Sequence, residues 1–253
     1  MIAFAVIFIL FVALTIYVVL AKKRREKAMA EFAIQHGWTP VNDPSSLYQY
    51  LPQYLQGLGQ NGYGFRGDFT RTINSFDMAY QANMNNIPSV FFQYTYTEYY
   101  FDYDPATNQQ RETAESHSFT VVNASLSNMV PTILLLHHSF ISKLATIGQH
   151  TGLQSVSLEG DFNKIFDTYI TPNGQDEALS LLSPETMELV VSAGRNASIQ
   201  LAGQALVFSS EVEPLNPSTI EPLLENIGKL VANINSKPQS ELLPDSPAAG
   251  SQQ

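Results

Sequence analysis

The sequence contains no cysteine, a single tryptophan and few charged residues. Without cysteine the chain can form no disulfide, no thiolate nucleophile, no zinc–thiolate site and no iron–sulfur cluster. Of the 13 basic and 23 acidic residues, 8 and 22 follow residue 27. A domain this acidic would be repelled by a phosphate backbone. We therefore expect no nucleic-acid partner.

The motifs of the common enzyme classes are also missing. The chain has no Walker loop, no G-x-S-x-G elbow and no S-x-x-K sequence. Residues 57–62, GLGQNG, match the dinucleotide pattern G-x-G-x-x-G, but no clear strand precedes them and no clear helix follows. We interpret them as part of a flexible connector. The sequence thus predicts no catalytic residue and no cofactor.

An uncharged run opens the chain and predicts a membrane-spanning helix over residues 1–21. Twenty residues in a helix extend about 30 Å, the thickness of the hydrocarbon core. Neither a basic region before the run nor a small-residue cleavage site after it is present, and both are typical of a cleaved signal peptide. We expect the helix to remain as an anchor in the lipid bilayer.

Basic residues crowd only the C-terminal flank of this run. Cations stay on the cytoplasmic side, so we expect the N-terminus outside and the soluble domain in the cytoplasm, at the inner (cytoplasmic) membrane. The same cations suit either a simple stop-transfer flank or contact with anionic lipid headgroups, and both can hold together. They are Lys22, Lys23, Arg24, Arg25 and Lys27.

The rest of the chain divides by composition. We expect a basic juxtamembrane helix over 22–37, ended by Gly37, and a Pro/Gly-rich connector over 38–64 in which Asp43 caps a short helix. A soluble domain follows over 65–235, with division into halves 65–140 and 150–235 as an option. Residues 236–253 are expected to be a disordered tail.

Grouped strands with helices between the groups favour an α+β fold, a mainly antiparallel sheet with packed helices, over a parallel α/β sheet. Ser183 with Pro184 predicts the start of one helix, and Ser218 with Glu221 has the spacing of a capping box for another. A hairpin turning at Ala202–Gly203 is expected between them. Strands are predicted at VFFQYTYTEYYFDY, SFTVVNASL and TILLL.

The first of these strands changes phase near Glu98. Phe92, Tyr94 and Tyr96 share one face, whereas Tyr99, Phe101 and Tyr103 lie on the other. A bulge or the end of burial on one side would explain the change. Such rings are usually sheet core, but exposure of the last three would make them a surface for a ligand or partner.

Histidines His117, His137, His138 and His150 are close in sequence, but they lack the spacing of a metal motif. Adjacent strand residues point to opposite faces, so His137 and His138 cannot serve one ion. Asp102 and Asp104 share a face, yet the following PATN lacks the pattern of a calcium loop. The sequence therefore predicts no metal site.

The arrangement of these elements resembles a bacterial family of membrane-anchored proteins known only as a domain of unknown function. The segment between Phe76 and Pro88 departs from that family's pattern. The resemblance implies packing roles for Phe162, Phe166 and Leu182–Pro184, and it implies no catalytic residues. It rests on the anchor and basic flank, Gly37–Trp38, GFRGDF, TVVNASLSNMVPTILLL, EGDFNKIFDTYIT, DEALSLLSPETMELV, the hairpin and the closing helix.

Together these features predict a single-pass membrane protein whose acidic domain is an interaction or scaffolding module for an unknown protein partner, more an adaptor than an enzyme. The alternative is a membrane-tethered enzyme or small-ligand binder with a site between the two halves. That site would draw on Asp102, Asp104, His117 or His137. An outward-facing domain is a third option that depends only on topology.

Overall fold

The computed structural model describes eight stretches of the chain. The glycine motif after Gly57, His150 and the tail after residue 237 lie outside them. The described residues are 2–57, 71–84, 86–104, 109–138, 152–158, 160–194, 197–211 and 215–237.

One long helix, α1 (Ile2–Gln35), joins the apolar run to the domain. Its 34 residues correspond to about 51 Å. It ends at Gln35, two residues before Gly37, whose left-handed φ of +67° turns the chain as expected, while the Trp38 amide donates to the Ala33 carbonyl at 2.8 Å. Among the described residues it is the one helix long and apolar enough to cross a membrane, and none of its most apolar window is buried.

Short elements follow where a connector was expected: β1 (Thr39–Pro40), the 3₁₀ helix η1 (Pro44–Tyr50) and α2 (Gln53–Gln56). Asp43 caps η1 as predicted, its Oδ1 accepting from the Ser45 amide at 3.0 Å. Leu47 and Leu55 are fully buried. These two leucines bring the segment into the domain core, so the folded part starts before residue 65.

The sheet is antiparallel throughout, which confirms the α+β prediction. Its order is β1-β2-β3-β4-β6-β5, and β7 pairs with β4. The 29-residue β4 is the central strand, because β3 and β7 both pair with its residues 120–124 and must therefore use opposite edges. The strands are β2 (Arg71–Met84), β3 (Ile87–Asp104), β4 (Gln109–His137), β5 (Gln154–Val156), β6 (Phe166–Ile170) and β7 (Ala197–Ser210).

Two sequence expectations were wrong in this region. The strands expected at 118–126 and 132–136 are one strand, β4, and the hairpin expected at Ala202–Gly203 is one strand, β7. The two strands bend together: Gly203, at φ +57°, faces Val130, where the β4–β7 register shifts on either side. A bulge on β4 met by a left-handed glycine interrupts the ladder only locally, and pairing resumes on both sides where the sequence suggests turns.

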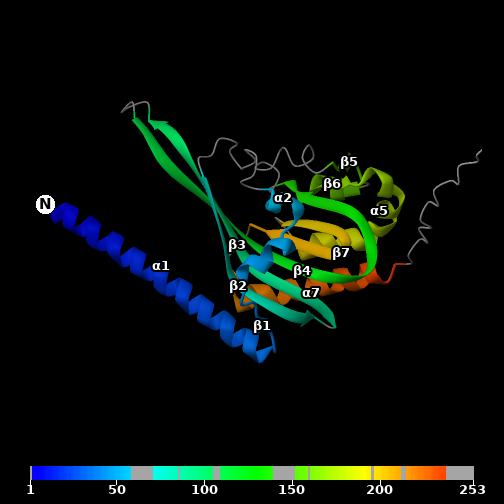
Figure 1. The fold of residues 1–253 in the computed structure, drawn as a ribbon, viewed down its shortest axis with the longest axis horizontal. Helices are drawn as coiled ribbons and strands as arrows, with labels where there is room; N and C mark the ends of the chain where they lie inside the picture. Colours follow the sequence, from blue (N-terminus) through cyan, green and yellow to red (C-terminus); the bar gives the residue numbers. More distant parts are fainter. Residues whose placement is uncertain are drawn as a thin grey trace, which may run out of the picture.

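Helices cover one face of the sheet and the short elements η1 and α2 cover the other (Figure 1). Ser183 caps α6 as predicted, accepting from the Thr186 amide at 3.4 Å. The cap of α7 is Asn216 rather than Ser218, because Pro217 already occupies the first helical position. The covering elements are η2 (Gly160–Lys164), η3 (Pro172–Gly174), α5 (Gln175–Leu181), α6 (Pro184–Ala193), α7 (Pro217–Asn235) and the last turns of α1.

Strands β3 and β4 continue as a two-stranded arm (residues 100–104 and 109–113) beyond Tyr99, the last β3 residue that pairs with β2 among the described residues (Figure 1). Their register is unbroken at Glu98, so the change of phase there marks a change in burial and not a bulge. The bulge lies on β2 instead, at Met78, whose φ is +48°.

Candidate functional site

Most residues singled out in the sequence are not brought together. Asp102 lies on the exposed arm opposite Arg111, and nothing is described of the Asp104 side chain. His137 ends β4 beside the Phe166 ring, at the far end of the strand from His117. The predicted site between two halves is therefore not assembled from Asp102, His117 and His137.

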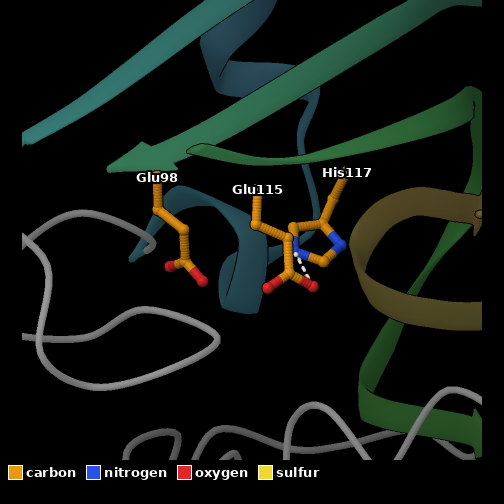
Figure 2. A group of neighbouring side chains, drawn as sticks. All are labelled: Glu98, Glu115 and His117. Atoms are coloured by element: carbon orange, nitrogen blue, oxygen red, sulfur yellow. Dashed lines mark ion pairs between the residues drawn. The ribbon is translucent and has the colours of Figure 1, made fainter. Parts of the chain in front are cut away.

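The structure does place His117 in a polar cluster at the root of the arm. Glu98 lies directly opposite Glu115 in the β3–β4 register, and His117 is the next residue of β4 on the same face. Figure 2 shows the two carboxylates and the imidazole on this one side of the sheet. One ligand atom from each lies within 4.8 Å of the others. We call Glu98, Glu115, His117 and the adjoining Glu211 the acid–histidine cluster.

Distances within the acid–histidine cluster set the roles of its members. His117 Nδ1 lies 2.8 Å from Glu211 Oε1, and His117 Nε2 lies 3.5 Å from Glu115 Oε1. The Tyr96 hydroxyl donates to Glu98 Oε2 at 3.3 Å. Burial raises the pKa of Tyr96 and the Glu98 carboxylate raises it further, so this hydroxyl stays protonated and remains a donor.

Burial makes the cluster unusual. Glu98 is 0% exposed and His117 2%, although Glu115 and Glu211 reach solvent. Like charges directly opposite each other destabilise a sheet, and buried carboxylates need compensating positive charge or hydrogen bonds. An imidazole nitrogen and carboxylate oxygens are also ligand atoms for transition metals. The arrangement is therefore suited to holding a cation.

A second polar cluster on this face fastens α2 to β7. The Tyr54 hydroxyl contacts the Oγ atoms of Ser198 and Ser209, which lie 2.8 Å from each other. The Gln53 amide donates to Gln200 Oε1 at 2.9 Å. These groups satisfy one another inside the core, so their role is structural.

An apolar groove of about 860 Å³ opens elsewhere, between η2 and α6. Phe162, Ile165 and Met187 are among its lining residues, and none of its lining residues belongs to the acid–histidine cluster. The Phe162 ring stacks on the buried Phe166 at a centroid distance of 5.1 Å. The groove is thus an edge of the helix-covered core.

Glu98, Glu115 and Glu211 were missed in the sequence, where the expectation of no metal site considered only the histidines, Asp102 and Asp104. The signal that could have found two of them is alternation: Glu98 continues the face of Tyr94 and Tyr96. In the same way Glu115 continues the face of His117 and Phe119. The sequence of either strand alone does not show that these two faces pair, because that depends on the β3–β4 register.

The surface residues Tyr99, Phe101 and Tyr103 lie on one side of β3 where it enters the arm. Phe101 is 59% exposed and Tyr103 54%, whereas Tyr99 is half-buried. Both exposed rings stand beside polar cross-strand neighbours, Glu112 and Gln110. The arm therefore presents two aromatic side chains to its surroundings.

No protein-family model matches this chain, and no curated protein matches its sequence. Among solved structures, the fold is similar to the crystal structure of the mycobacterial trehalose monomycolate transport factor A, TtfA. The TM-score is 0.51 at 10% sequence identity, and the match covers 85% of this chain and 98% of that chain. At this identity the likeness shows the fold alone.

Proposed function

We propose that this chain is a single-pass membrane protein whose acidic α+β domain lies at the cytoplasmic face and acts as an interaction module for another protein. The observation that carries the proposal is the double character of α1. Its first part exposes large apolar side chains such as Phe4 and Phe8, while Met29 and Ala33 near its end are buried in the domain core. An apolar surface of this length needs a bilayer around it.

The basic flank supports the cytoplasmic orientation. Lys23, Arg24 and Lys27 are exposed, and Lys22 also pairs with Asp77 of β2 at 3.5 Å. These cations lie where the helix would leave the bilayer, which suits contact with anionic headgroups of the inner leaflet.

The partner surface that we propose is the arm, through Phe101 and Tyr103. Aromatic side chains are enriched in protein interfaces, and exposed rings on a two-stranded ribbon can reach a neighbour without moving the core. The name of the fold neighbour, a transport factor, is in keeping with an accessory role.

Reporter fusions at the C-terminus of the full chain test the orientation. We expect a fluorescent protein to be bright there and alkaline phosphatase to be inactive, because the phosphatase needs the oxidising exterior. Active phosphatase would place the domain outside and reject the proposal.

Photo-cross-linking in cells tests the interaction surface. We expect a photoreactive amino acid at position 101 or 103 to give a discrete adduct with another protein. The matched control is position 225 on α7, where Glu225 is similarly exposed. Equal labelling at all three positions, or none at 101 and 103, would contradict the proposed role of the arm.

A further inference from the structure

We propose that Glu98, Glu115 and His117 bind one divalent transition-metal ion of the zinc type, with Glu211 orienting the imidazole. The site would be separate from the interaction surface, since Phe101 and Tyr103 lie on the opposite face of β3.

The sheet places the three ligands close to the required geometry. Two donors each about 2.0–2.1 Å from a tetrahedral ion lie about 3.4 Å apart. The distance between His117 Nε2 and Glu115 Oε1, 3.5 Å, already matches this donor–donor separation. All three ligand atoms lie within 4.8 Å of one another. Side-chain rotations that move these atoms by roughly an ångström would bring them to bonding distance from one ion. Ligands on paired strands are held more precisely than ligands on loops.

Glu211 supplies an independent argument. Its carboxylate lies 2.8 Å from His117 Nδ1, where it accepts the Nδ1 proton. The lone pair of the neutral ring then belongs to Nε2, on the side of Glu115. This carboxylate–histidine–metal relay is the usual way in which a ligand histidine is oriented and made more basic. Tyr96 holds the Glu98 carboxylate in the same manner.

The ligand types favour a transition-metal ion. One imidazole nitrogen and two carboxylates converge here. The imidazole suits zinc, copper, iron or nickel, whereas magnesium and calcium prefer oxygen ligands.

Metal titration of the full chain in detergent, after chelator treatment and dialysis, tests the proposal. We expect calorimetry to give one Zn²⁺ per chain. We expect Co²⁺ to produce the intense visible absorption of a four-coordinate site, and Mg²⁺ to give neither signal. Wild-type protein without saturable Zn²⁺ or Co²⁺ binding would overturn the proposal and leave the cluster as an internal ion-pair network.

Variants then assign the ligands. We expect His117→Gln and Glu98→Gln to weaken Zn²⁺ binding at least 100-fold, and Glu211→Gln to weaken it about 10- to 100-fold. The matched control is His138→Gln, because His138 also pairs with a carboxylate, Asp167 at 3.1 Å, but outside the cluster. Circular dichroism checks that each variant folds. Unchanged affinity in a folded His117→Gln protein would overturn the assignment.

Discussion

At the scale of single residues, helix caps illustrate how two adjacent polar side chains can compete for one role. Asn216 Oδ1 accepts from the Thr219 amide at 3.1 Å and from the Ser218 hydroxyl at 2.6 Å. The Ser218 hydroxyl therefore supports the cap without being the cap. The capping-box spacing from Ser218 to Glu221 was misleading, because the helix starts at Pro217, two residues earlier than a Ser218 cap implies.

Substitution of the cap separates these roles. We expect Asn216→Ala to lower the free energy of unfolding by about 1 kcal/mol, since the Thr219 amide loses its side-chain acceptor and keeps only the carbonyl of residue 216. The control, Ser218→Ala, should change it by less than about 0.5 kcal/mol. Chemical denaturation in detergent, followed by circular dichroism, measures both. A larger loss for Ser218→Ala would show that the serine is the true cap.

At the scale of elements, the shared bend of β4 and β7 depends on one glycine. Gly203 adopts φ +57°, a conformation that costs a residue with a Cβ about 1–2 kcal/mol. An added Cβ would meet only the Met129 Cε, at 3.9 Å, so backbone strain and not collision sets the cost.

A pair of glycine-to-alanine changes tests this account through opposite signs. We expect Gly203→Ala to lower the free energy of unfolding by about 1 kcal/mol. Gly228→Ala in α7 should raise it by up to about 1 kcal/mol, because alanine favours a helix and nothing lies within 4 Å of the added Cβ. Thermal unfolding of the two proteins gives the comparison. Equal shifts in the same direction would be inconsistent with strain at Gly203.

At the scale of the whole molecule, the end of α1 fixes the domain to the apolar helix. Met29 is fully buried, and Trp38 packs edge-on against Phe91 at a centroid distance of 4.8 Å. The Lys22–Asp77 pair is half exposed, so it adds little to this attachment. Apolar packing is what holds the helix to the domain.

Truncation of a buried side chain should loosen this attachment. We expect Met29→Ala to lower the free energy of unfolding by about 2–5 kcal/mol and to shift the emission of Trp38 to longer wavelength. Ile34 on the same helix is 76% exposed, so Ile34→Ala serves as the control and should be nearly neutral. Trp38, the one tryptophan, reports on both. A neutral Met29→Ala would mean that α1 does not depend on this contact.

How much of this the sequence could predict differs with the range of the interaction. The anchor, the caps at Asp43 and Ser183 and the α+β class follow from local pattern, because composition and spacing determine them. The continuity of β4 through Pro131 does not, because a bulge and a turn use similar residues. The acid–histidine cluster is harder still to predict from the sequence, because only the cross-strand register places Glu98 opposite Glu115.

The unbroken course of α1 from apolar run to domain core has a geometric consequence. A helix turns about 100° and rises about 1.5 Å with every residue. Each residue inserted between Arg24 and Met29 would therefore rotate the domain and its arm by about 100° about the axis of α1, while moving them only about 1.5 Å along that axis. Such an insertion would keep the packing of Met29 and Ala33 but move Lys22 away from Asp77, and it would change the direction in which the aromatic arm points relative to the apolar part of α1.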